Sequence, residues 1–194
     1  MIGGIQSDIE CYIAKENVFR KYTPQPIRAF AELSPGKILL VCSYGLLLLD
    51  KETGQEEILL NGYLAQDILV IDNDIWLGTS GDGLVYYNYV TKEIKKYTTG
   101  TGLLSDYVNS IAYANGYLWL GTESGLCRFS PIDNSVLTYS SIFSLSNLAF
   151  NINSKYRLKN GDLILGTSNG AIMFDPNMLY QTRQKGRIFF QDIS

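Results

Sequence analysis

The sequence predicts an all-β protein made of β-propeller blades, and two repeated patterns predict it. The first is a four-residue pattern, Trp-Leu-Gly-Thr or Ile-Leu-Gly-Thr, which occurs at residues 76–79, 119–122 and 164–167, at steps of 43 and 45 residues. Each copy is followed by a short turn and a second apolar run. A repeat of this length with several short strands is typical of a propeller, in which each unit is a four-stranded blade.

The second pattern is a constant spacing of ten residues between the expected third strand and the expected outer strand of a unit. It joins Tyr12 to Tyr22, Leu49 to Leu59, Tyr87 to Tyr97, and Phe129 to Tyr139. This spacing extends the repeat to the first 60 residues, where the four-residue pattern has decayed. We therefore expect about four to five blades, part of a larger propeller, at residues 1–22, 27–59, 65–97, 108–139 and 152–180. Residues 181–194 are expected to begin a following immunoglobulin-like domain or to form a closing strand, with the strand itself at 187–193.

The repeated residues have structural roles in this interpretation. A tryptophan at position 76 or 119 buries a large apolar surface between neighbouring blades. Glycines at 78, 121 and 166 are expected where strands or sheets approach too closely for a side chain. Glycines at 83, 125 and 170 are expected to provide the positive φ of a hairpin turn.

Composition narrows the function classes. The formal net charge is −3, which provides no basic surface for nucleic acid. No apolar run approaches the ~20 residues of a membrane-spanning helix, so this segment is expected to make no membrane contact. The three cysteines fit no metal or redox spacing, and no cofactor or metal is expected. Histidine is absent, which weighs against catalysis because histidine is the commonest general base.

The repeat resembles the two-component-regulator propeller family, the periplasmic sensor domains of bacterial hybrid two-component systems. Residues 75–87 and 118–129 match its pattern closely, and 38–49 and 163–174 match with substitutions. The run 148–151, together with 159–163 and 174–176, is similar to the last blade of the family's propeller. The resemblance implies a non-catalytic sensor that passes ligand binding to a kinase, in a periplasmic, membrane-anchored parent protein. The chain has no signal peptide and no kinase, so we expect an excised or truncated C-terminal part of a propeller.

Candidate ligand-binding residues come from the expected inner strands and the loops that lead into them. Polar residues at equivalent positions of these strands are expected to line the channel and to bind a polar ligand such as an oligosaccharide, or instead to bond to neighbouring strands. The strand positions are Arg28, Gln66, Asn109 and Asn153. The loops add aromatic side chains that could stack on sugar rings, namely Tyr63, Tyr107 and Phe143, and also Tyr22, which doubles as an outer-strand residue.

Two other functions remain open. The first is a protein-interaction scaffold, because incomplete blades leave unpaired strands that favour association, for example as a homodimer through open blade edges. The second and least favoured is a propeller polysaccharide lyase or glycosidase, which would use Asp67 and Asp106 as a carboxylate pair.

Overall fold

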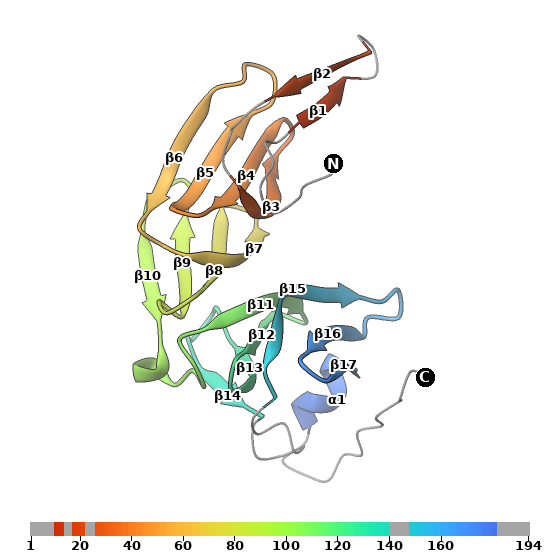
Figure 1. Cartoon of the computed structure of the whole chain (residues 1–194). Coiled ribbons are helices and arrows are strands. Elements are labelled where there is room, and N and C mark those ends of the chain that lie inside the picture. The colour runs from red at the N-terminus through yellow and green to blue at the C-terminus, as the bar shows by residue number, and fades with distance from the viewer. Residues whose placement is uncertain (1–9, 14–16, 22–25, 140–147, 182–194) are drawn as a thin grey trace.

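The computed structural model describes residues 10–13, 17–21, 26–139 and 148–181. Within them the chain is almost entirely β-structure, arranged as antiparallel sheets that follow one another in sequence order. Figure 1 shows the sheets along an arc that is open on one side. The all-β fold predicted from the repeats is confirmed.

Three sheets have four strands each, ordered as a meander. The first contains β3 (Ile27–Ser34), β4 (Lys37–Cys42), β5 (Gly45–Asp50) and β6 (Glu56–Asn61). The second contains β7 (Ala65–Ile71), β8 (Asp74–Thr79), β9 (Leu84–Asn88) and β10 (Ile94–Tyr97). The third contains β11 (Val108–Ala114), β12 (Tyr117–Thr122), β13 (Gly125–Phe129) and β14 (Val136–Thr138).

The two ends of the chain differ from this pattern. At the N-terminal end, β1 (Glu10–Ile13) and β2 (Val18–Lys21) form a two-stranded hairpin. At the C-terminal end, β15 (Phe150–Arg157), β16 (Leu163–Thr167) and β17 (Gly170–Phe174) form a three-stranded sheet. It begins at Phe150 rather than near Ile152, and the helix α1 (Pro176–Gln181) follows it. The strand expected at 187–193 lies outside the described residues. A short 3-10 helix, η1 (Thr99–Thr101), connects the second sheet to the third.

The strands β3, β7, β11 and β15 lie nearest the concave side of the arc in Figure 1, each beside the next. They are the innermost strands of their sheets. All four strands run in the same direction, and each is the first strand of its sheet. Their first residues therefore lie along one rim of the arc, together with the turns after β4, β8, β12 and β16.

Aromatic side chains fill the space between successive sheets, as the tryptophan positions predicted. The ring of Trp76 lies 5.5 Å from the ring of Phe129 in the next sheet, centroid to centroid. Trp119 is equally buried and lies 4.9 Å from Phe174 of the following sheet. One face of each sheet therefore packs on the opposite face of the next one, which fixes the positions of the inner strands.

The glycine predictions also hold. A Cβ atom on Gly78 would lie 2.6 Å from the carbonyl oxygen of Val108, and one on Gly121 would lie 2.8 Å from Cβ of Phe150. Both contacts are with the neighbouring sheet, so only glycine lets the sheets approach this closely. Gly83 and Gly125 have φ angles of 73° and 129°, which favour glycine in these turns.

Candidate functional site

Three of the predicted polar residues occupy one structural position. Arg28, Gln66 and Asn109 each lie where the pairing between an inner strand and the second strand shifts register, leaving one extra residue on the inner strand. A β-bulge of this kind re-aims the side chain of the extra residue. The three side chains thus lie at the same level of three neighbouring sheets, along the rim of the arc where the inner strands begin.

The fourth sheet departs from this regularity. On β15 the register shift runs from Phe150 to Lys155, while β16 advances only from Thr167 to Leu165. The bulge on β15 therefore contains two more extra residues than the bulges on β3, β7 and β11. Asn151 takes the equivalent position if residues are counted forward from Phe150. Asn153 takes it if they are counted back from Ser154, because Ser154 faces Gly166 in the way that Ser110 faces Gly121. The sequence assigned this position to Asn153 alone, whereas in the structure Asn151 and Asn153 share it. The extra residues of the bulge are not visible in the sequence pattern.

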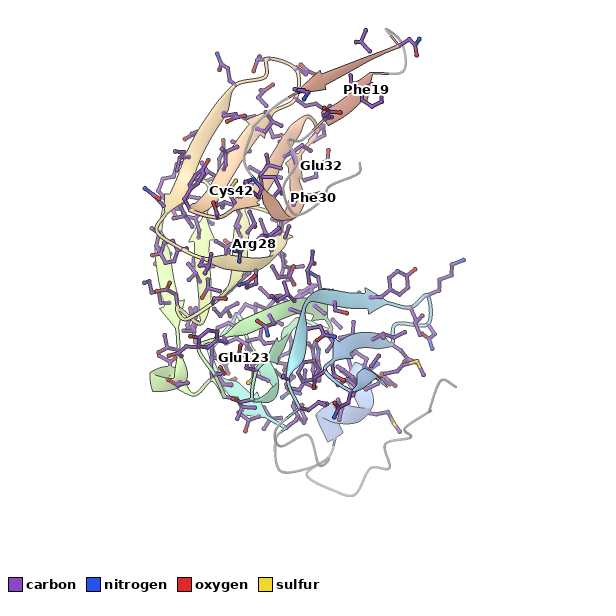
Figure 2. All side chains as sticks on the ribbon, viewed as in Figure 1. Phe19, Arg28, Phe30, Glu32, Cys42 and Glu123 are labelled. Atoms are coloured by element: carbon purple, nitrogen blue, oxygen red, sulfur yellow. The ribbon has the colours of Figure 1, made fainter. Side chains whose placement is uncertain are left out.

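These side chains bond to neighbouring strands, which is the alternative that the sequence left open. Arg28 Nη1 donates a hydrogen bond to Gln66 Oε1 at 3.0 Å, and Gln66 Nε2 donates to Ser80 Oγ. Asn109 Nδ2 donates to the carbonyl oxygen of Phe150 at 2.8 Å. Gln66 and Asn109 are buried, whereas Arg28 is exposed. Figure 2 shows Arg28 beside β7. Of the three, Arg28 is the one whose polar group is open to a ligand.

The aromatic loop residues lie at the same end of the strands. Tyr107 directly precedes β11, forms a backbone bridge with Ser80, and leaves 45% of its surface exposed. Tyr63 is partly buried, and the Lys96 ammonium lies 4.7 Å from the centre of its ring. Phe143 and Tyr22 lie outside the described residues. Tyr107 is therefore an exposed aromatic side chain whose backbone bridges to Ser80, the residue that accepts the Gln66 hydrogen bond.

A buried ion pair joins three inner strands just below this level. Asp67 on β7 has no exposed surface, and its carboxylate accepts hydrogen bonds from the backbone amides of Ile68 at 2.8 Å and Ile111 at 2.7 Å. The same carboxylate pairs with the ammonium of Lys155 on β15. Burial raises the pKa of Asp67, and the contacts with Lys155 and the two amides offset part of that rise.

The carboxylate of Asp67 is occupied by these contacts, and Asp106 has different ones. The Asp106 carboxylate accepts hydrogen bonds from the backbone amide of Thr99 at 2.6 Å and from its hydroxyl at 3.3 Å. The described contacts of the two carboxylates are thus made with different partners, and none of them joins Asp67 to Asp106. The arrangement offers no support for the lyase or glycosidase alternative.

Sequence reasoning missed Lys155 and Ser80. A signal for Lys155 was present, because it pairs with Leu165 as Ile68 pairs with Leu77 and Ile111 with Leu120, so a charge replaces an apolar residue at that position. Ser80 follows β8 directly, outside the apolar pattern of the repeat, and its link to Gln66 has no sequence signature.

The described residues contain no group of three or more histidine, cysteine, aspartate or glutamate side chains placed to hold a metal ion. Nor is any helix among them both long and apolar enough to cross a membrane.

Comparison with solved structures supports the fold. The extracellular domain assigned to the hybrid two component system BT3049 from B. thetaiotaomicron superposes with a TM-score of 0.70 at 18% identity, over 89% of this chain and 26% of its own length. The extracellular domain assigned to the one component system BT4673 from the same organism gives 0.70 at 17% identity, over 91% and 28%. The β-propeller domain of Cps50 (Swd1) from Myceliophteria thermophila gives 0.67 at 11% identity, over 89% and 60%. The chain thus spans about a quarter of the Bacteroides domains.

Sequence comparison identifies the repeat itself. No curated protein matches the chain. The family described as "Two component regulator propeller" matches residues 102–124, which run from the loop before β11 through β12 to the turn that follows. This segment includes the second copy of the Trp-Leu-Gly-Thr pattern, with Trp119 and Gly121 in the packing roles described above. The chain is a set of β-propeller blades, and its residues 102–124 match the two component regulator propeller family.

Proposed function

We propose that this chain is a non-catalytic, ligand-sensing propeller module of a two-component signalling regulator, acting in the periplasm as part of a membrane-anchored parent. We propose further that its ligand is polar, a glycan or similar nutrient, and that it binds where the inner strands begin. The family match and the Bacteroides extracellular domains support a signalling role. The ligand class rests on the chemistry of the site alone.

One observation carries the proposal. The polar side chains at this level connect successive sheets: Arg28 reaches Gln66 in the next sheet, and Asn109 reaches the backbone of β15 in the next. A ligand that engages one of these groups competes with a bond between sheets. Ligand binding there would therefore change how neighbouring blades are held, which is what a sensor must transmit.

The test is direct binding of oligosaccharides to the whole chain, by isothermal titration calorimetry. Arg28→Ala and Tyr107→Ala should weaken binding. Tyr107→Ala should leave the melting temperature nearly unchanged because the side chain is exposed, whereas Arg28→Ala also removes the bond to Gln66 and should lower it slightly. Asn109→Ala is a poor test, since it leaves the Phe150 carbonyl without its partner and should itself lower stability by about 1–3 kcal/mol. Equal affinity of both exposed-residue variants and the parent chain would reject this site.

Association of two chains through the outward face of the last described sheet, β15–β17, is a second candidate function, and one observation favours it. On the last sheet, Tyr156, Ile164 and Met173 occupy the positions at which Leu69, Trp76 and Tyr86 pack against a following sheet. Here Tyr156 is 64% and Met173 48% exposed. Light scattering should then give a mass that rises above 21.7 kDa with concentration, and Met173→Glu should abolish the rise. A constant monomer mass would reject it.

A further inference from the structure

Arg28 presents a positive charge that no acid in the described residues neutralises. Its guanidinium bonds to the neutral amide oxygen of Gln66, and the ion pairs of the described residues involve other cations. Gln66 is itself held by Ser80, so the guanidinium is anchored on one side. Among the described residues its other N–H groups have no acceptor, the side chain is exposed, and the planar guanidinium fits a carboxylate.

Of the acidic side chains at this end of the strands, one is paired with a cation and another is hydrogen-bonded to neutral groups. Asp82 pairs with Lys96 at 2.8 Å, and Asp106 is bonded to Thr99. Glu123, whose backbone amide bonds to the Tyr107 carbonyl, is exposed and lies two sheets along from Arg28; Figure 2 labels both residues, on different sheets of the arc. Of these three acids only Asp82 has a cation partner among the described ion pairs, so the group at this level that attracts an anion is the Arg28 guanidinium itself.

An exposed aromatic ring lies close along the same chain of contacts. Arg28 bonds to Gln66, Gln66 to Ser80, and the Ser80 backbone bridges to Tyr107. An aromatic face suits the apolar face of a sugar ring, and a guanidinium suits a carboxylate with two parallel hydrogen bonds. An oligosaccharide that carries carboxylates offers a partner to each group, with different sugar residues at the two positions.

We propose that the ligand is an acidic glycan, a chain containing uronic acid residues, and that Arg28 binds the carboxylate of one of them. This inference rests on the proposed sensing function and narrows its ligand class. Gln66 and Ser80 act as positioning residues that hold the guanidinium in place. Neutral glycans would bind through Tyr107 alone, and so more weakly.

The experiment compares acidic oligosaccharides with their own methyl esters, which keep the sugar ring and remove the charge. Oligogalacturonates, hyaluronan oligosaccharides and alginate oligosaccharides serve as probes, each titrated into the whole chain at low salt. We expect at least one acidic probe to bind about tenfold or more tightly than its ester, a loss typical of a charged hydrogen bond. Higher salt should narrow that difference.

Two charge-matched variants assign the effect. Arg28→Gln should remove the preference for the acid and leave ester binding unchanged. Arg157→Gln removes the same charge at the other end of inner strand β15 and should leave the preference intact. Equal binding of acids and esters, or a preference that survives Arg28→Gln, overturns the inference but keeps the sensing function. Failure of every acid and ester to bind overturns both.

Discussion

The Asp67 carboxylate and the Lys155 ammonium form an ion pair across 88 residues of sequence, linking β7 to β15 past the intervening strand β11. Each residue is exceptional at its repeat position. Ala29, Ser110 and Ser154 stand where Asp67 does, and Phe30, Ile68 and Ile111 stand where Lys155 does. Two charges that replace a small and an apolar residue, and that contact each other, thus link two sheets that have one sheet between them.

Removing the Lys155 ammonium should lower the free energy of unfolding strongly at neutral pH and less in acid. Lys155→Met leaves Asp67 buried without its counter-charge, and breaking a buried pair from one side costs about 3–5 kcal/mol. Burial already raises the pKa of Asp67 above its unfolded value, and the substitution raises it further. The variant is therefore stable while Asp67 is protonated and loses stability as pH rises through that raised pKa. Urea unfolding at pH 5 and pH 7.5 measures both effects.

The control is the double variant Asp67→Asn with Lys155→Met, which removes both charges. Its stability should lie above that of Lys155→Met at pH 7.5 and should change less with pH. If the single and double variants unfold at the same urea concentration at both pH values, Asp67 does not carry a buried charge.

Close sheet packing predicts a large effect at one glycine and a small one at another. Gly121→Ala places a methyl group against Phe150 of the next sheet and against the Ser110 hydroxyl. Overpacking of this kind costs about 1–3 kcal/mol. Gly100→Ala in the 3-10 helix meets only the Thr98 hydroxyl at 3.4 Å, an ordinary contact. Thermal unfolding should show a lower melting temperature for the first variant and little change for the second; similar shifts in both would contradict the packing role of Gly121.

The repeat made the fold predictable, and its limits show where prediction stopped. Strand order and the contacts of Trp76 and Gly78 follow from residues that recur at fixed spacing, because each sheet must pack on the next in the same way. The inner-strand level was predicted from the same periodicity for Arg28, Gln66 and Asn109. The periodicity did not show that Asn151 shares the position of Asn153, because β15 contains extra residues in its bulge, and it did not show the pairing of Lys155, whose partner lies two sheets away. Contacts that break a repeat leave no periodic signal, so they require the structure.

Trp119 should be a stability determinant, as its place between two sheets implies. Its indole contacts Tyr139 at 5.7 Å and Phe174 at 4.9 Å, centroid to centroid. Trp119→Ala should destabilise the chain by about 3–5 kcal/mol, the usual cost of deleting a large buried aromatic side chain. Leu137→Ala on the outer strand β14 removes a partly exposed side chain and should cost far less. Denaturant unfolding followed by far-UV circular dichroism distinguishes the two, and comparable costs would refute the assignment.

Thiol reactivity offers a measurement that leaves the fold intact. Cys42 and Cys127 are both fully buried, and burial raises the pKa of the Cys127 thiol to about 11. The thiolate is the reactive form, so both groups should be inert toward a maleimide or Ellman's reagent in the native state at pH 8. In a Cys11→Ser background, labelling should become fast only on unfolding in denaturant, with two thiols reacting per chain. Rapid labelling of the native Cys11→Ser variant would mean that the sheets open readily. Cys42 on β4 and Cys127 on β13 would then be exposed far more often than close packing of successive sheets allows.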